Sequence, residues 1–327
     1  MTYWSGKRVL CTGAGGFLGS HLAERLASEG ARVHAMIHYH ALGTWGWLEG
    51  SPHADRMDII AGDVRDSGFV RAAMKGVHTV FHLAARVSIP DSYRAPRSAF
   101  DTNAGGTLNI LEAARDCHVK RVVVTSTSEV YGTCVSAPMS ELHPLQAQSP
   151  YSASKIAADK LAESFHRSFG LPVVTIRPFN TFGPCQSTRA IVSTIISQCL
   201  NGGRVTLGNL SPTRDLSYVS NTVDAFLLAG SVPGIEGQVF NVGSGREISV
   251  GDLVTLIAVT MGKLVHVVPD ADRVRPASSE VDRLVCDASK ARSVLGWEPK
   301  VTLEDGLALT IAWMRENVGR YRHGYAI

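Results

Sequence analysis

The chain has 327 residues, of which 45% are hydrophobic and 19% are charged, and its formal net charge is +3. This composition is typical of a globular protein, and the small net charge argues against a nucleic-acid-binding or membrane-surface protein. The six cysteines form no CxxC pair, no apolar run approaches a membrane span, and the first residues lack a signal-peptide pattern. We therefore expect a cytoplasmic protein. We expect no metal site, because the histidines form no ligand cluster.

Short apolar runs alternate with helix-like spacing of Leu, Ala and Phe through the first half of the chain. The runs predict strands at Arg8–Cys11, Arg32–Ile37, Met57–Ala61, Thr79–His82, Val122–Thr125 and Val173–Ile176. The segments between them predict helices at 17–29, 66–75, 98–116 and 152–169. Strand–helix alternation implies right-handed crossovers. The expected fold class is therefore α/β, a doubly wound parallel sheet with helices on both faces.

The pattern changes after Arg177-Pro178, where Gly and Pro become frequent and the apolar runs become shorter. We expect a first domain over 1–177 and a smaller C-terminal α/β substrate lobe over 178–327. The segment 216–244 contains the apolar run 239–242, which is typical of a buried strand, and is expected to return to the first domain.

The first predicted strand leads into Gly13, Gly16 and Gly19, spaced as GxxGxxG, at the start of the first predicted helix. Glycines let the backbone approach a pyrophosphate closely, and a helix N-terminus presents free amides to the anion. The position between a strand and a helix favours a dinucleotide-binding motif over a plain tight turn, which is the alternative. The first domain is therefore predicted to be Rossmann-type and to bind a dinucleotide.

The residues after the second predicted strand leave the choice between NAD and NADP open. An acid that binds the adenosine ribose of NAD is expected there, but the chain has His38, Tyr39 and His40. No arginine pair suited to a 2′-phosphate stands there either. Asp63, after the third strand, is a candidate acceptor for the adenine amine, and the alternative is that it caps the helix at 66–75.

Tyr151 and Lys155 are four residues apart at the start of a predicted helix, so their side chains share one helical face. A lysine ammonium near a phenol stabilises the phenolate and lowers the pKa of the tyrosine, which then acts as a base near neutral pH. The YxxxK spacing alone is a weak signal. Together with the glycine motif it indicates a dehydrogenase-type site.

With these motifs the chain resembles, over nearly its whole length, the extended short-chain dehydrogenases/reductases, the branch of NAD-dependent nucleotide-sugar epimerases, dehydratases and decarboxylases. The motifs that carry the resemblance are Gly13–Gly19, Gly62–Asp66, His82–Ala85, Asp101–Asn103, Thr127–Gly132, Tyr151–Lys155, Arg177–Asn180 and Leu295–Pro299. The resemblance implies that Thr127, Tyr151 and Lys155 are the hydroxyl residue, the base and the lysine of the catalytic set.

The resemblance also implies a cofactor and an assembly. The cofactor is NAD or NADP, tightly bound and recycled in each turnover. The residues expected to contact it are Gly13, Gly16, Phe17, Leu18, Gly19, His38, Asp63, Val64, Leu83, Ala84, Ala85, Asn103, Tyr151 and Lys155. A homodimer is expected through the helices near 98–116 and 152–169.

Glu129 follows the valine-rich fifth strand and, by resemblance, distinguishes the reaction. Family dehydratases use a glutamate here to remove the C5 proton of a transient 4-ketone while the 6-hydroxyl leaves as water. Epimerases acting only at C4 generally lack an acid at this place. Ser128 stands where many dTDP-glucose dehydratases have Asp, and Thr-Ser-Glu is more similar to the GDP-sugar dehydratases. The resemblance therefore implies a nucleotide-sugar 4,6-dehydratase with Thr127, Ser128 and Glu129 in its site.

Three alternatives stay open. UDP-glucuronate decarboxylases also carry Thr-Ser-Glu, and a 4-epimerase would use the same scaffold. A non-catalytic dinucleotide sensor is the remote alternative. The more specific resemblance is to bacterial GDP- or UDP-N-acetylglucosamine 4,6-dehydratases, and it rests on the segments 44–48, 125–132, 148–155, 179–184 and 275–281. The tryptophans at 45 and 47 are equally compatible with a surface anchor.

A nucleotide-diphosphate sugar requires cations and amides in the second lobe. By resemblance the substrate-binding residues are Ser88, Asn180, Arg214 and Arg275. Arginine forks match phosphate oxygens bidentately, and a surface ion pair is the alternative for each arginine. Asn221 stands where the family often has Asp.

Overall fold

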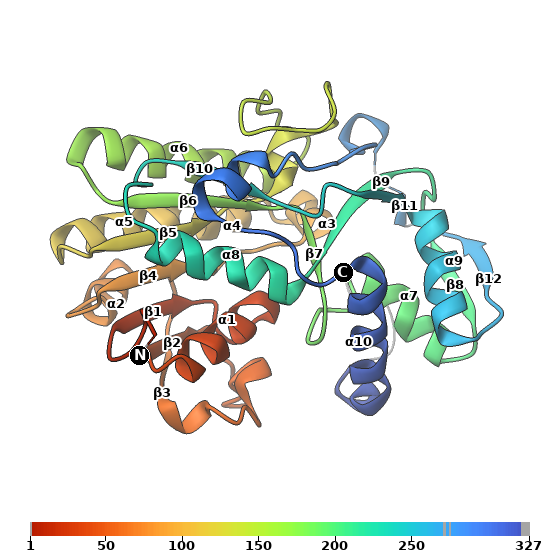
Figure 1. Cartoon of the computed structure of the whole chain (residues 1–327), viewed down its shortest axis with the longest axis horizontal. Coiled ribbons are helices and arrows are strands. Elements are labelled where there is room, and N and C mark those ends of the chain that lie inside the picture. Colours follow the sequence, from red (N-terminus) through yellow and green to blue (C-terminus); the bar gives the residue numbers. More distant parts are fainter. Residues whose placement is uncertain (1, 271–272, 275, 322–327) are drawn as a thin grey trace.

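The computed structural model describes residues 2–270, 273–274 and 276–321. Its large sheet has the strand order β10-β6-β5-β4-β1-β2-β3, and all neighbouring strands are parallel (Figure 1). The strands are β1 (Arg8–Thr12), β2 (Arg32–Ile37), β3 (Met57–Ala61), β4 (Thr79–His82), β5 (Arg121–Thr125), β6 (Val173–Pro178) and β10 (Val239–Val242). The predicted α/β fold with a parallel sheet is confirmed.

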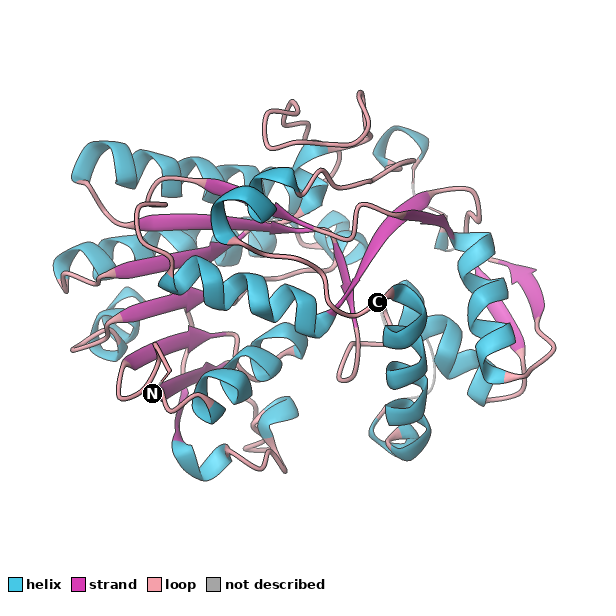
Figure 2. Ribbon diagram, in the orientation of Figure 1, coloured by secondary structure: helices cyan, strands magenta, loops and turns pink. Residues whose placement is uncertain are grey.

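Helices cover both faces of this sheet (Figure 2). One face carries α2 (Ser67–Ala73), α5 (Gly106–Asp116) and α6 (Pro150–Phe169), and the other carries α1 (Phe17–Ser28) and α8 (Val219–Ser231). Successive residues of a strand point to opposite faces. Accordingly Val9 and Cys11 of β1 belong to the core under α1 and α8, whereas Leu10 belongs to the core under α5.

The predicted helix at 98–116 is interrupted. The structure has α4 (Pro96–Phe100), a π turn at Asp101–Gly105 and then α5. A short helix that the sequence pattern did not predict, α3 (Ile89–Arg94), precedes them. Further short 3₁₀ or π turns lie at Gly46–Leu48, Ala54–Arg56, Ser128–Tyr131, Ala277–Ser279, Ala291–Leu295 and Val318–Arg320.

A second core lies beyond β6, on the right in Figure 1. It combines a three-stranded sheet, β11-β9-β7, with a two-stranded sheet, β12-β8. Its elements are β7 (Asn180–Phe182), α7 (Ile191–Leu200), β8 (Arg204–Leu207), β9 (Thr213–Tyr218), β11 (Glu247–Ser249), α9 (Val250–Met261), β12 (His266–Pro269) and α10 (Leu303–Glu316). Between these elements the chain returns to the large sheet through α8 and β10. The division at residues 177 and 178 stays a prediction.

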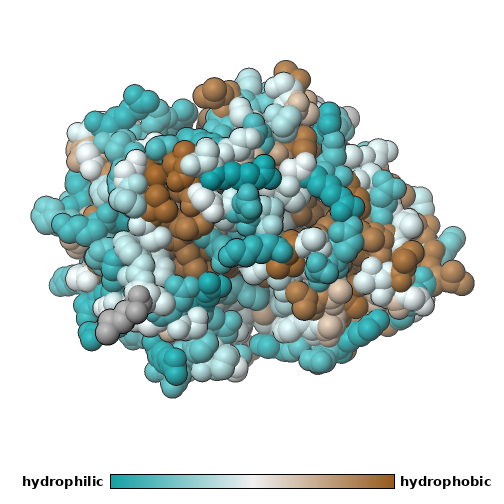
Figure 3. Space-filling view, in the orientation of Figure 1, coloured by the Kyte–Doolittle hydropathy of each residue, from teal (hydrophilic) through white to brown (hydrophobic). Residues whose placement is uncertain are grey.

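The surface carries both hydrophobic and hydrophilic residues. On the face shown in Figure 3, hydrophobic areas are separated by hydrophilic residues. Among the described residues, no helix combines the length and the apolar character that crossing a bilayer requires. The same residues contain no group of three or more His, Cys, Asp or Glu side chains arranged to hold a metal ion.

Candidate active site

The candidate site lies where the strand order of the large sheet reverses. β1 pairs with β2 on one side and with β4 on the other, so the connections leave this point in opposite directions. Ligands of open α/β sheets bind outside the carboxyl ends of the strands at such a point. Here the two strand ends are joined, because Thr12 Oγ1 accepts from the backbone N–H groups of Leu83 at 3.2 Å and Ala84 at 3.1 Å.

The glycine loop after β1 leaves no room for side chains. Gly13 has φ +72°, and a Cβ there would lie 2.8 Å from the backbone nitrogen of Ala84. A Cβ at Gly19 would collide with the carbonyl oxygen of Gly13. Helix α1 begins at Phe17 with Gly16 as a cap that offers no side-chain acceptor, and no acid lies in the first turn. The first-turn amides of α1 are therefore suited to an anion, and the loop fits the pyrophosphate of a dinucleotide.

The adenosine end of the predicted site contains His38 and Asp63. Nε2 of His38 lies 3.6 Å from Oδ2 of Asp63. The Arg65 guanidinium bonded to Asp63 holds the pKa of that carboxyl at about 2. The alternative reading of Asp63 as the cap of α2 is wrong, because Asp66 caps that helix by accepting from Phe69 N–H at 3.0 Å. The sequence pattern did not separate these two acids, which are only three residues apart.

Asn103 connects the loop after β4 to helix α6, which carries Tyr151 and Lys155. Its Oδ1 accepts from Arg86 N–H at 2.7 Å, and its Nδ2 donates to Arg86 O and to Ser154 Oγ. Ser154 Oγ in turn donates to Tyr151 O at 2.6 Å. The π turn that contains Asn103 interrupts the helix at this point, and such turns are frequent at functional sites. Near it, Val64 O accepts from Asn109 Nδ2 at 2.9 Å.

His82 is a positioning residue to which the sequence analysis assigned no role. It is buried, with Nδ1 2.8 Å from Thr12 Oγ1 and Nε2 3.1 Å from Thr107 Oγ1. Thr12 already accepts two backbone bonds, so its hydroxyl proton points to Nδ1 and the hydrogen of His82 sits on Nε2. Burial lowers the pKa of His82 to about 3, so the imidazole is neutral. In the sequence, His82 ends an apolar strand and begins the motif His82–Ala85, and neither feature indicated this role.

The start of α6 holds the predicted tyrosine in place. Ser149 and Ser152 form a reciprocal capping box, with Ser152 N–H donating to Ser149 Oγ at 3.1 Å and Ser149 N–H donating to Ser152 Oγ at 3.0 Å. Tyr151 lies between them, and its own N–H donates to Ser92 Oγ at 3.2 Å. These bonds satisfy the first amides of the helix and fix the direction in which it enters the site.

The structure brings Thr127, Glu129 and Tyr151 together. Thr127 and Glu129 both act on the pKa of the Tyr151 phenol, Thr127 lowering it through hydrogen bonding and Glu129 raising it through its charge. Thr127 also caps the 3₁₀ turn that carries Glu129, accepting from Glu129 N–H at 3.2 Å. Ser128, next in the chain, is buried. Within the described part of the chain, no hydrogen bond or ion pair occupies the carboxylate of Glu129.

The electrostatics of the tyrosine differ from the expectation. Burial raises the pKa of Tyr151, the Thr127 hydrogen bond opposes this rise, and the charge of Glu129 adds to it. Lys155 does not lower the pKa of Tyr151 as predicted. Its Nζ donates instead to the carbonyl oxygen of Thr125 at 2.5 Å. Burial lowers the pKa of Lys155 to about 8, against the opposing charge of Asp159.

Three buried polar atoms beside this set have no hydrogen-bond partner: Thr125 Oγ1, Ser126 Oγ and Asn180 Oδ1. Thr125 is the last residue of β5 and Ser126 follows it, and Asn180 begins β7 just after the neighbouring strand β6 ends. Buried polar groups in proteins are almost always paired, so unpaired ones at strand ends fit a bound polar ligand. These atoms are consistent with the nicotinamide end of a dinucleotide and with a hydroxylated substrate.

The structure says less about substrate binding by the other predicted residues, Ser88, Arg214 and Arg275. Ser88 caps α3 by accepting from Asp91 N–H at 3.2 Å. Arg214 is 9% exposed, and its guanidinium lies 3.5 Å from Glu280 and donates to Thr213 O. Arg275 lies outside the described residues. The phosphate-binding role of both arginines stays a prediction.

Comparisons with known proteins give the site a context. Residues 10–310 match the family model described as GDP-mannose 4,6 dehydratase. A UDP-glucose 4-epimerase of Mycolicibacterium smegmatis is 36% identical, over 94% of this chain and 98% of that protein. A dTDP-glucose 4,6-dehydratase of Streptomyces antibioticus is 35% identical, over 94% and 92%. The crystal structure of DesIV, a dTDP-glucose 4,6-dehydratase from Streptomyces venezuelae with NAD and TYD bound, has a TM-score of 0.87 at 30% identity and covers 96% of this chain and 99% of that one.

Proposed function

The chain belongs to the NAD-dependent epimerase/dehydratase family of short-chain dehydrogenases/reductases, and we propose that within this family it is a nucleotide-sugar 4,6-dehydratase, a lyase. Its substrate is an NDP-hexose or an NDP-N-acetylhexosamine, and its product is the 4-keto-6-deoxy sugar. The cofactor is NAD, and it supplies a hydride acceptor that is restored within each turnover. Structural relatives with NAD bound support this cofactor.

Tyr151 and Thr127 are the groups that meet the 4-hydroxyl of the sugar. Thr127 is near enough to Tyr151 to affect its pKa, so both side chains can meet one oxygen of the sugar. Tyr151 takes the proton of that hydroxyl as C4 is oxidised. Burial favours the neutral phenol, and Tyr151 acts as a base only after it has lost its own proton. In the complex with cofactor and substrate, the ammonium of Lys155, one helical turn away, is the proposed cation that favours this loss.

Glu129 is the observation that carries the proposal. A ketone at C4 makes the hydrogen on C5 acidic, and a 4,6-dehydratase needs a base for that proton. The carboxylate of Glu129 is close enough to affect the pKa of Tyr151 and is not engaged by another described side chain. It takes the C5 proton and then returns it to the departing 6-hydroxyl, which leaves as water. C6 would then receive the hydride and C5 a proton from solvent, while the proton that Tyr151 took from the 4-hydroxyl is released to solvent.

The second candidate is a 4-epimerase, which the identity to the mycobacterial UDP-glucose 4-epimerase favours. An epimerase returns the hydride to C4 on the other face of the sugar and needs no base at C5. A decarboxylase on the same scaffold would instead release carbon dioxide from a UDP-glucuronate. Glu129 favours dehydration over epimerisation, and the choice between dehydration and decarboxylation depends on the substrate.

The proposal extends to the domains, the assembly and the location of the enzyme. The segment over 1–177, with 216–244, holds the dinucleotide, and the lobe over 178–327 holds the nucleotide sugar, through Ser88 of the first segment and Asn180, Arg214 and Arg275. The enzyme is further proposed to be a homodimer that associates through α5 and α6, and to be located in the cytoplasm. The resemblance to GDP- or UDP-N-acetylglucosamine dehydratases supports an N-acetylhexosamine nucleotide as the first substrate to test.

The test is incubation with UDP-, GDP- and dTDP-hexoses, N-acetylhexosamines and UDP-glucuronate in heavy water. Dehydration gives a 4-keto product with deuterium at C5. Unlabelled C4 epimer as the only product, or carbon dioxide release, overturns the proposal. The Glu129→Gln variant should lose dehydration by about 10²- to 10⁴-fold, yet still form reduced nicotinamide, because C4 oxidation does not use this residue. Glu316→Gln, an exposed change at the end of α10, is the matched control.

A further inference from the structure

We propose that Tyr93 is a positioning residue of the enzyme. Through Ser279 it holds residues 278–283, a segment bonded to the second core, against the start of helix α6, and thereby keeps Tyr151 in its reacting position. The inference rests on the proposed function. It goes beyond that function because it assigns a part in the reaction to a side chain outside the catalytic set.

Tyr93 and Ser279 are 186 residues apart in the sequence, and their hydroxyl oxygens lie 2.5 Å apart. Ser279 Oγ donates its own proton to the carbonyl oxygen of Gln148. The phenol of Tyr93 is therefore the donor of the Tyr93–Ser279 bond. Tyr93 is 37% exposed, whereas Ser279 is 9% exposed, so the serine end of this bond is largely buried. One serine hydroxyl thus links α3 to the residue that precedes the cap of α6.

The side chain of Gln148 binds the same segment. Its Nε2 donates to Glu280 O at 3.1 Å, and its Oε1 accepts from Thr133 N–H at 2.5 Å. Thr133 Oγ1 in turn accepts from Asp282 N–H at 3.2 Å. Thr133 comes two residues after the 3₁₀ turn that carries Glu129. The segment is therefore attached on both sides of the catalytic set, after the turn with Glu129 and before the cap of α6.

The segment is also attached to the second core. Asp282 O accepts from Thr213 N–H of β9 at 2.9 Å, and Thr213 O accepts from Leu284 N–H at 3.2 Å. Oε1 of Glu280 lies 3.5 Å from Nη2 of Arg214, the residue predicted to bind the substrate diphosphate. The segment therefore runs from the lobe proposed to hold the nucleotide sugar to the helix that carries the proposed base.

Helix α3 contacts Tyr151 from a second direction. Ser92, next to Tyr93 in α3, accepts from Tyr151 N–H at 3.2 Å. Ser92 is buried, and its hydroxyl donates to Ile89 O at 2.7 Å. Because α3 has only six residues, its position depends on tertiary contacts rather than on its own helical stability. Loss of the Tyr93–Ser279 bond should therefore loosen α3 and the start of α6 together.

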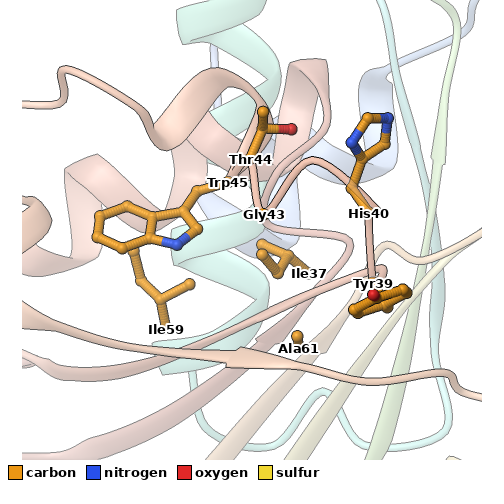
Figure 4. Close-up of a pocket in the computed structure, with 8 residues that line it drawn as sticks. All are labelled: Ile37, Tyr39, His40, Gly43, Thr44, Trp45, Ile59 and Ala61. Atoms are coloured by element: carbon orange, nitrogen blue, oxygen red, sulfur yellow. The ribbon is translucent and has the colours of Figure 1, made fainter.

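The proposed dinucleotide end of the site is separate from these contacts. A cavity of about 150 Å³ lies at the carboxyl ends of β2 and β3 (Figure 4), lined by Ile37, Tyr39, His40, Gly43, Thr44, Trp45, Ile59 and Ala61. A Cβ at Gly15 would lie 2.9 Å from Trp45 O, so the wall of this cavity touches the glycine loop. Tyr93, Gln148 and Ser279, all within the described chain, do not line it. Retention of a dinucleotide therefore reports whether a variant is folded, independently of the Tyr93 contact.

The experiment measures turnover per bound dinucleotide in full-length variants. The substrate is UDP-N-acetylglucosamine, or the sugar of the panel above that the wild type converts, and bound NAD⁺ is counted by native mass spectrometry. Tyr93→Phe should lower kcat about 2- to 10-fold, the effect of one hydrogen bond between neutral groups, with bound NAD⁺ unchanged. KM should change by less than about twofold, because the phenol acts through Tyr151 and not on the bound sugar.

Tyr3→Phe is the matched control. Tyr3 is 45% exposed, and its hydroxyl makes no hydrogen bond within the described part of the chain, so kcat should not change. Ser279→Ala removes the hydroxyl to which Tyr93 donates, and it should lower kcat at least as much as Tyr93→Phe. Adding Tyr93→Phe to Ser279→Ala should lower kcat no further, because the phenol then has no partner to lose.

Hydrogen exchange tests the contact without a substrate. The amides of Thr133 and Asp282, which belong to the same set of bonds, should exchange faster in Tyr93→Phe and in Ser279→Ala than in Tyr3→Phe. Unchanged exchange at both amides would mean that the Tyr93–Ser279 bond does not hold the segment, and it overturns the inference.

The kinetic outcomes separate this inference from the proposed function. Equal kcat per bound NAD⁺ in Tyr93→Phe and the wild type, or additive losses in the double variant, overturn the role of Tyr93 alone. A loss of bound NAD⁺ that accounts for the whole loss of turnover also overturns it, since the residue then only stabilises the fold. If the wild type converts none of the sugars, the proposed function fails and this inference fails with it. Epimerisation or decarboxylation by the wild type overturns the dehydratase proposal alone, because these reactions also begin with oxidation at C4.

Discussion

Nε of Arg177 donates to Oδ2 of Asp159 at 2.9 Å, and neither side chain is more than 6% exposed. The guanidinium also donates to Tyr131 OH at 2.8 Å, and that hydroxyl donates to Asn241 Oδ1. These buried hydrogen bonds join β6 and β10 to α6, the helix that carries Tyr151 and Lys155. Asp159 lies one helical turn beyond Lys155 and acts on its pKa. The charge of Asp159 therefore acts on two buried cations, of which it contacts Arg177.

Asp159→Asn should lower the free energy of unfolding by about 3–5 kcal/mol, because it leaves the buried guanidinium of Arg177 without its counter-charge. Urea denaturation measures this loss. The control is Glu304→Gln, which breaks the Arg246–Glu304 pair, whose side chains are 58% and 48% exposed. That change should cost less than about 1 kcal/mol. Equal effects of the two variants would contradict the assignment.

His82 should make the protein sensitive to acid. Its pKa is about 3 in the fold and near 6.5 when unfolded, so the unfolded chain binds more protons between these values. The free energy of unfolding should therefore fall as the pH drops from 6.5 towards 3, by at most about 5 kcal/mol from this residue. Unfolding curves of His82→Gln should show a shallower fall, and those of His40→Gln, at an exposed position, should match the wild type.

Lys155 should make the stability of the protein rise with pH in the alkaline range. Its pKa is about 8 in the fold and 10.5 for the free side chain, so the unfolded chain again binds more protons in that interval. Its burial cost is present in full below pH 8 and is relieved as the pH rises to 10.5. The stability difference between the wild type and Lys155→Met should change by up to about 3 kcal/mol across this range. A constant difference would mean that the ammonium is not buried as described.

Gly13→Ala should impair both folding and dinucleotide binding, because the new Cβ meets the backbone of Ala84. Gly6→Ala is a matched control, since Gly6 has φ +74° against +72° for Gly13 but nothing within 4 Å of the added Cβ. The control should lose only about 1–2 kcal/mol from the left-handed backbone. Thermal unfolding and NAD⁺ binding, measured on both variants, separate backbone strain from the collision. A Gly13→Ala protein that binds NAD⁺ normally would exclude the close approach.

Asn221→Asp should destabilise the protein by about 1–3 kcal/mol, although a family member with Asp at this place would be unremarkable. Asn221 Nδ2 donates to Val301 O at 2.8 Å, and its Oδ1 accepts from the N–H groups of Lys300 and Val301. A carboxylate loses the donor and places an anion against the carbonyl. Asn209→Asp is the control, because only the Oδ1 of exposed Asn209 is bonded, to Ser211 N–H. Denaturation midpoints of the two variants give the comparison.

The large sheet was predictable because each strand is a short run of apolar residues with clear ends. The strands at 32–37, 57–61 and 79–82 have the expected bounds. The break at Asp101–Gly105 was not predictable, because a turn of five residues is too short to give a periodic signal of its own. The strands of the second core were harder to predict, because they mix polar and apolar residues and form no continuous apolar run, as in Thr213–Tyr218.

The candidate site, like the fold, was predictable from the sequence only in part. The spacing of Tyr151 and Lys155 predicts a shared helical face. Their pKa values, however, depend on burial and on partners such as Thr125 and Asp159, which no local pattern reveals. The neutral tautomer of His82 likewise depends on hydroxyls supplied by Thr12 and Thr107, which lie on separate elements.

The place of β10 in the large sheet affects how the protein is made. This strand pairs with β6, but the chain builds α7, β8, β9 and α8 before it reaches Val239. A nascent polypeptide that has emerged from the ribosome only as far as β6 presents the open edge of that strand, and open edges recruit other polypeptides. Until translation has passed Val242, we therefore expect the growing chain to be more prone to aggregation than the finished one.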